Sequence, residues 1–116
     1  MMKLYTIKER KKDLQTEYKR ILDIIARKYK PEKVILFGSF AKGEIHEWSD
    51  IDMLIIKETS LRPIERPVEL SRLVEPKVGI DFFIYTPDEY EILLSEKYSF
   101  LVNIIKKGKV VYEKGS

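Results

Sequence analysis

The sequence contains no cysteine and a single histidine among its 116 residues. The lack of cysteine excludes a disulfide framework and thiolate chemistry, and one histidine excludes a cluster of histidines around zinc. No apolar run approaches the roughly 18 residues that a membrane-spanning helix needs, and the N-terminus lacks the apolar segment of a signal peptide. We therefore expect a cytoplasmic protein with no membrane partner.

The sequence also lacks a large excess of charge of either sign. Lysine and arginine number 22 against 19 aspartate and glutamate residues, so the formal net charge is only +3. Because the two signs are interspersed along the chain, the pattern argues against direct nucleic-acid binding, while the small positive excess suits an anionic ligand such as a nucleotide. The length and the hydrophobic fraction of 44% predict a single domain over residues 1–116.

The apolar residues of the first 30 positions follow a helical period. Thr6 and Glu9 have the spacing of a capping box, and the periodic pattern continues until Pro31 interrupts it. We therefore expect one amphipathic helix from Thr6 to Lys28, with its apolar stripe packed on a sheet.

Short apolar runs separated by turn residues predict the strands of that sheet. The runs that we expect to be strands are 34–37, 51–56 and 77–85, with 109–113 as a last edge strand. The later helices that we expect are a short turn at 39–42, then 67–74, 87–94 after a capping box at Thr86, and 98–107 ended by Gly108. This alternation predicts an α/β (α+β) fold, in which a mixed sheet of three to four strands is covered by helices.

Two aspartates stand at the start of an otherwise apolar strand. Asp50 and Asp52 are two residues apart, and because side chains at i and i+2 share a face, both carboxylates project to one place. Asp81 interrupts a later apolar strand, where aspartate is disfavoured, and it reaches the same place if the two strands pair. Three gathered carboxylates need a proton or a cation, and their oxygen ligands favour Mg²⁺. Two such ions, about 3.5–4 Å apart, suit phosphoryl transfer.

A Gly-Ser pair stands at the junction that follows the strand 34–37. Gly38 lets the backbone approach a ligand closely, and the Ser39 hydroxyl and the amides after it can bind phosphate oxygens. Each feature has an ordinary alternative when it is taken alone: Gly-Ser is a common turn, Asp50 suits a solvated turn, and Asp81 can pair with a lysine. Their joint occurrence on the predicted strands favours a site for metal and nucleoside triphosphate.

The segments GSFAKG, SDIDMLI and GIDFFIY together resemble the nucleotidyltransferase superfamily of the DNA polymerase beta type. The pattern of that family is Gly-Ser, ten residues, Asp-x-Asp, and a third acidic residue on a later strand, and residues 40–49 supply the ten here. The motifs run from Val34 to Tyr85, and the small size resembles the minimal nucleotidyltransferases, in particular the MntA-like antitoxins of two-gene toxin–antitoxin pairs. The resemblance implies a nucleotidyltransferase-type sheet.

The resemblance also implies a role for each motif residue. The residues that would bind the nucleotide are Gly38, Ser39 and Lys42. The residues that would bind Mg²⁺ and take part in catalysis are Asp50, Asp52 and Asp81, the last also helping to activate the acceptor hydroxyl. Many relatives carry arginine where Lys42 stands, and lysine can meet a phosphate only as a point charge.

The implied reaction is a Mg²⁺-dependent transfer of AMP from ATP to a hydroxyl group. In MntA-like relatives the acceptor is a tyrosine of a partner HEPN-domain toxin, a ribonuclease that the transfer silences. Only residues 86–116 follow the last motif, so we expect a partner protein to present the acceptor. Two alternatives remain open: a non-catalytic binding module that neutralises its partner by association, and a small-molecule nucleotidyltransferase similar to the aminoglycoside-modifying enzymes.

Overall fold

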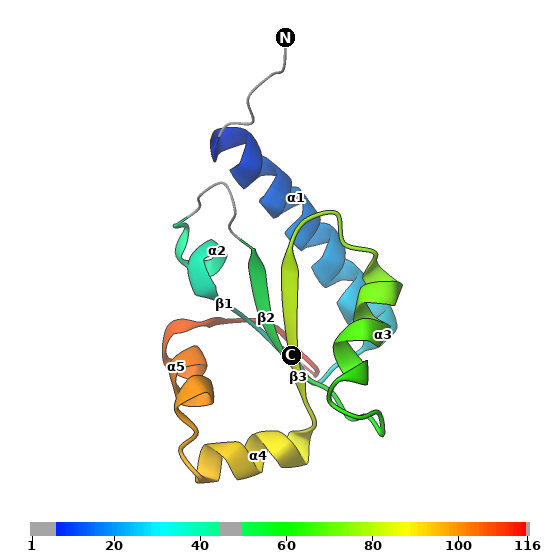
Figure 1. Ribbon diagram of the computed structural model, residues 1–116, viewed down its shortest axis with the longest axis vertical. Helices are drawn as coiled ribbons and strands as arrows, with labels where there is room; N and C mark the ends of the chain where they lie inside the picture. The colour runs from blue at the N-terminus through cyan, green and yellow to red at the C-terminus, as the bar shows by residue number, and fades with distance from the viewer. Residues whose placement is uncertain (1–6, 45–49, 116) are drawn as a thin grey trace.

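The computed structural model describes residues 7–44 and 50–115, and it is built on one four-stranded sheet (Figure 1). The strands are β1 (Lys33–Phe37), β2 (Ile51–Ile56), β3 (Ile80–Tyr85) and β4 (Lys109–Glu113). Their spatial order is β3-β2-β1-β4, in which β2 and β3 are parallel and the other neighbours are antiparallel. The predicted α/β fold with a mixed sheet is confirmed, and the expected last edge strand is β4.

Helical segments connect and flank these strands. They are α1 (Ile7–Ile24), its π-helical continuation η1 (Ile25–Tyr29), α2 (Gly38–Lys42), α3 (Glu65–Val74), α4 (Pro87–Ser95) and α5 (Ser99–Lys107). Within the described ranges 7–44 and 50–115, no helix combines the length and the apolar character needed to cross a membrane.

The helices cover both faces of the sheet (Figure 1). On one face, α1, η1 and α3 pack over the larger apolar cluster, which includes Leu14, Met53 and Leu70. On the other face, α4 and α5 pack over a smaller cluster around Leu54 and Leu101. Because β2 lies between β1 and β3, its apolar side chains are buried on both faces, as its sequence predicts.

The first helix follows its predicted amphipathic pattern, with a change of geometry at its end. Residues 25–29 form a π-helical turn, and Lys30 then adopts the left-handed conformation, with φ of 54°, immediately before Pro31. The N-terminal residue of the predicted capping box, Thr6, lies outside the described residues, as do residues 45–49 of the expected loop. The second predicted capping box is confirmed, because Thr86 and Glu89 exchange the two hydrogen bonds at the start of α4.

Two predicted starts shift by two or three residues, and the predicted stop at Gly108 is confirmed. β3 begins at residue 80 rather than 77, because the Lys77 amide donates a hydrogen bond to Glu17 on α1 instead of joining the sheet. α3 begins at residue 65, two positions before Pro67. Gly108 ends α5 in an extended conformation, and glycine is needed there because a Cβ would lie 2.6 Å from the Ile104 carbonyl oxygen.

Candidate active site

The starts of β2 and β3 bring two aspartates side by side. In the parallel pairing of these strands, Asp52 lies directly opposite Asp81. The Ile51 amide donates to the Gly79 carbonyl oxygen at 3.1 Å, which extends the ladder beyond the first residue of β3. Neighbouring strands lie about 4.8 Å apart, and opposed side chains share a face, so the two carboxylates are adjacent. The pairing on which the predicted carboxylate cluster depends is therefore present.

An aromatic floor lies beside the two carboxylates, on the face covered by α4 and α5. Phe37 is the register partner of Asp52 on β1, and Phe83 follows Asp81 by two residues on the same face of β3. The rings of Phe37 and Phe83 lie 5.6 Å apart, and Phe100 of α5 lies 6.0 and 5.3 Å from them. This floor removes water from one side of the site.

The surroundings of Asp52 change its acidity. Burial raises the pKa of Asp52 from its ordinary value of 3.8 to about 6, and the negative charges of Asp81 and then Asp50 add to the rise. Asp50 and Asp81 are themselves exposed. A partly buried carboxylate beside two others is stabilised by a proton or by a cation, so the site attracts positive charge.

Gly38 closes the site from the side of β1. Its φ of 82° lies in the region that favours glycine, and a Cβ at this position would overlap the Asp52 carboxylate. Gly38 therefore lies directly against a predicted metal ligand. Ser39 and Lys42 follow Gly38 in the five-residue helix α2, where Ser39 is half-buried and Lys42 is exposed.

A second glycine, Gly79, shapes the other side of the site. A Cβ on Gly79 would overlap the Asp50 carboxylate, so Asp50 lies against the residue that precedes β3. Gly79 was not singled out from the sequence, and its place two residues before Asp81 is the only sequence signal for it. The pair of glycines gives the carboxylates of Asp50 and Asp52 the space that they occupy.

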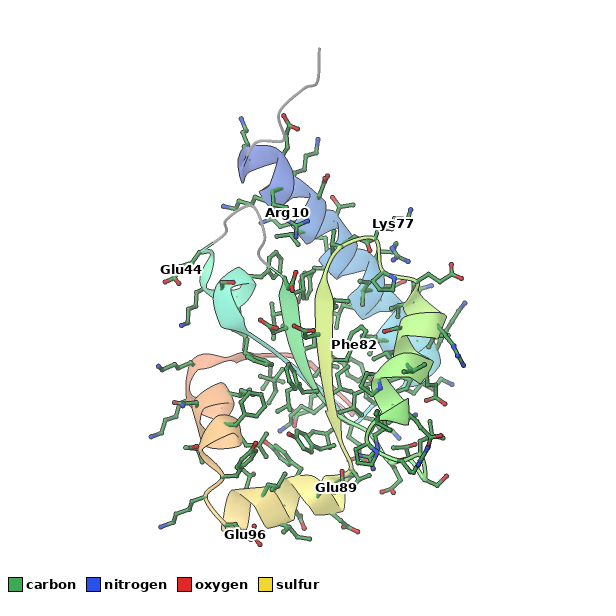
Figure 2. The ribbon with its side chains drawn as sticks, in the orientation of Figure 1. Arg10, Glu44, Lys77, Phe82, Glu89 and Glu96 are labelled. Atoms are coloured by element: carbon green, nitrogen blue, oxygen red, sulfur yellow. The ribbon has the colours of Figure 1, made fainter. Side chains whose placement is uncertain are left out.

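A partly buried ion pair on α1 holds the connection that leads into β3. Glu17 pairs with Arg20 at 2.5 Å and accepts a hydrogen bond from the Lys77 amide at 2.7 Å. Arg20 also donates to the Glu75 carbonyl oxygen at 3.0 Å. Figure 2 labels Lys77 at this end of β3. Because Asp81 follows this connection, the ion pair fixes where the aspartate-bearing strand begins.

A second ion pair holds the opposite end of β3. Arg66 of α3 has only 5% of its side chain exposed, and it donates to both carboxylate oxygens of Glu89 at 2.7 and 3.1 Å. The same guanidinium donates to the Ile84 carbonyl oxygen at 3.2 Å. Glu89, labelled in Figure 2, stands at the start of α4. β3 is thus tied to α1 at one end and to α3 and α4 at the other.

The residues present fit a hard divalent cation only in part. Among the described residues, no three acidic, histidine or cysteine side chains stand together as a ready-made metal site. The adjacent pair Asp52 and Asp81, however, offers oxygen donors and a raised pKa that a cation would lower. Asp50 contributes its charge at longer range. The structure therefore brings together a carboxylate pair with a third carboxylate nearby.

Comparison with known proteins places these features in a family. The family described as polymerase beta nucleotidyltransferase matches residues 19–116. Over 98 residues the chain is 33% identical to a protein of Methanocaldococcus jannaschii named as a candidate protein adenylyltransferase, and the match covers 81% of this chain and 93% of that protein.

Solved structures share the fold. A candidate nucleotidyltransferase of Sulfolobus solfataricus superimposes with a TM-score of 0.61 at 20% identity, covering 98% of this chain and 93% of that one. The toxin–antitoxin MntA-HepT gives a TM-score of 0.50 at 18% identity, covering 86% of this chain and 73% of that one. At these identities the likenesses establish the arrangement of helices and strands alone.

Proposed function

The chain belongs to the polymerase beta nucleotidyltransferase family, and from that membership we propose that it transfers AMP from ATP to a hydroxyl group of a partner protein. The observation that carries the proposal is the direct opposition of Asp52 and Asp81 near the starts of the parallel strands β2 and β3. The name of the Methanocaldococcus relative, a candidate protein adenylyltransferase, supports a protein as the acceptor.

Each site residue has a role in this reaction. Asp52 and Asp81, with Asp50 nearby, would hold the Mg²⁺ that accompanies the nucleotide, and we expect two ions. Bound there, Mg²⁺ would offset the carboxylate charges and polarise the α-phosphate. Gly38 and Ser39 receive the triphosphate next to Asp52.

The chemical step is a displacement at phosphorus. Asp81 accepts the proton of the acceptor hydroxyl, and the hydroxyl oxygen forms a bond to the α-phosphorus. The bond between the α-phosphorus and the bridging oxygen breaks, and pyrophosphate leaves with its electron pair. The partner then carries AMP through a phosphodiester bond.

The partner that we propose is a HEPN-domain toxin, with a tyrosine as the acceptor. The fold likeness to the antitoxin-containing pair MntA-HepT supports a toxin partner. A toxin of this kind and ATP both occur in the cytoplasm, where we place the reaction. The chain would then act as an antitoxin by modifying its partner.

A labelling assay tests the proposed activity. The chain is incubated with ATP labelled at the α-phosphate, Mg²⁺ and a HEPN-domain protein as the proposed partner, and label on the partner is measured. Asp52→Asn and Asp81→Asn should each reduce labelling by at least about a hundredfold, because each removes a charge that acts on the reacting groups. Asp88→Asn, an exposed aspartate on α4, is the matched control and should label normally. A folded wild-type chain that leaves the partner unlabelled contradicts the proposal.

A second function that we consider is neutralisation of the partner by association alone, without AMP transfer. The observation that favours it is that no three metal-binding side chains stand together among the described residues. An Asp50→Asn, Asp52→Asn double variant separates the two functions. If that variant protects cells from the toxin as fully as the wild-type chain does, association is sufficient; if protection is lost while the complex still forms, transfer is required.

A further inference from the structure

A cavity of about 260 Å³ lies between α2 and the second half of α5. Gly38 and Lys42 line it from α2, and Asn103 and Lys107 line it from α5, while Phe37, Phe100 and Ile104 form its apolar part. In Figure 1, α5 lies next to α2 at one side of the sheet. Gly38 is shared by the cavity and the carboxylate site, because it lines the cavity and also lies directly against Asp52.

The polar lining of the cavity has one sign of charge. Lys42 and Lys107 bring two ammonium groups, Asn103 brings an amide that can donate hydrogen bonds, and none of the described residues that line the cavity is a carboxylate. In the described part of the chain, neither lysine forms a salt bridge with an acidic residue, and both are exposed. Unpaired cations from two helices around one hollow are suited to an anion.

The position of Lys107 on α5 explains how it reaches the cavity. Phe100, Asn103 and Lys107 are spaced at i, i+3 and i+7, so they share one face of the helix. Phe100 anchors that face on the aromatic floor of the site. The neighbouring Lys106 stands in the same last turn but does not line the cavity. Lys106 and Lys107 therefore have the same relation to the helix dipole and differ in their relation to the cavity.

We propose that Lys107, with the support of Asn103, binds the β- and γ-phosphates of the nucleotide opposite Lys42. This inference rests on the proposed function, because that function puts the α-phosphate at the carboxylates. The rest of the triphosphate must then lead away from negative charge, and the cavity that Gly38 also lines is the adjacent cationic space. Each ammonium acts as a point charge, so one from each helix holds the phosphates from two sides.

Calorimetric titration of the purified chain in magnesium buffer tests the inference, with ATP, pyrophosphate and AMP as separate ligands. Lys107→Gln should weaken binding of ATP and pyrophosphate by about tenfold or more, the effect of one charge-assisted hydrogen bond. It should leave AMP binding unchanged, because AMP lacks the β- and γ-phosphates. Lys106→Gln is the matched control and should change all three affinities by less than about twofold. Lys107→Arg should restore most of the affinity, and Asn103→Asp should weaken pyrophosphate binding through repulsion.

The outcomes separate this inference from the proposed function. If Lys107→Gln and Lys106→Gln have the same affinity for pyrophosphate, the inference is wrong even when AMP transfer to the partner proceeds. If Lys107→Gln alone loses pyrophosphate and ATP affinity while no label reaches the partner, the inference holds and the transfer function fails. If Lys107→Gln weakens AMP as much as ATP, the assignment to the β- and γ-phosphates is wrong.

Discussion

Replacing Asp52 by asparagine should stabilise the metal-free protein while it abolishes the proposed activity. Asparagine has nearly the same shape but no charge, so it removes the repulsion from Asp81 and Asp50 and the penalty of burying a carboxylate. A residue that serves only the fold would show the opposite result, because its loss would destabilise the chain. The stability of this variant therefore reports whether the carboxylate is held against its own electrostatic preference.

The size of the effect follows from the pKa of Asp52. The rise from 3.8 to about 6 corresponds to roughly 3 kcal/mol at most, because one pKa unit equals about 1.4 kcal/mol. Asp52 is only partly buried, and solvent screening reduces the value, so we expect a gain of about 1–2 kcal/mol at pH 8. For a chain of this length the gain raises the melting temperature by about 3–10 °C.

The pH dependence gives the sign of the effect. The folded-state pKa of Asp52 is raised above its unfolded value, so the folded state binds more protons between pH 3.8 and about 6, and wild-type stability falls as the pH rises through that range. Below pH 3.8 the carboxyl is protonated in both states, and the Asp52→Asn variant should have no advantage. The advantage should grow between these values and be complete above pH 6.

Urea denaturation in EDTA at pH 3.5, 5 and 8 measures this difference, with Glu91→Gln, an exposed change on α4, as the control. Adding Mg²⁺ with a non-hydrolysable ATP analogue should then stabilise the wild type by about RT ln(1 + [L]/Kd) and leave Asp52→Asn unchanged. A variant that is no more stable than the wild type at pH 8, or a gain that is the same at every pH, would refute the electrostatic reasoning.

Two further predictions concern the supports of the site. Gly79→Ala should lower AMP transfer more than stability, because the added methyl overlaps the Asp50 carboxylate, and the loss should shrink in an Asp50→Ala background when both are compared in the labelling assay. Glu17→Ala should destabilise the fold by about 2–4 kcal/mol at pH 7 in urea denaturation, because it leaves Arg20 and the Lys77 amide without their partner. The hydrogen bond from Arg20 lowers the pKa of Glu17, so wild-type stability should be lost as the pH falls below 4.5, whereas the variant should lack that loss.

The strands that carry the site were predictable because their residues are apolar on both faces and are bounded by turn residues. β2 matches the expected range 51–56, and β4 matches 109–113. The proximity of Asp52 and Asp81 could be predicted only on the condition that their two strands pair, because the sequence does not show which strands are neighbours. Parallel pairing in that register is a tertiary property, and the structure supplies it.

The supports of the site were less accessible from sequence. Glu17 is a charged residue on the apolar stripe of α1, which is a usable signal, but its acceptor role depends on where the α3–β3 connection passes. Gly79 has an ordinary backbone, and only the position of Asp50 explains it. Lys107 has the sequence context of a dipole-compensating residue at a helix end, and its link to the nucleotide appears only when α5 folds back beside α2.

The charges of this chain nearly balance, yet around Gly38 they are separated. The Asp52 carboxylate lies against this glycine, and two lysines line the cavity that the glycine borders. The carboxylates alone would suit a simple cation, and the lysines alone would suit a simple anion. A nucleoside triphosphate with its metal presents both charges in one ligand, with the positive part at the α-phosphate and the negative part in the tail. Because Gly38 lies against Asp52 and also lines the cavity, one such ligand can contact the carboxylate and the lysines together.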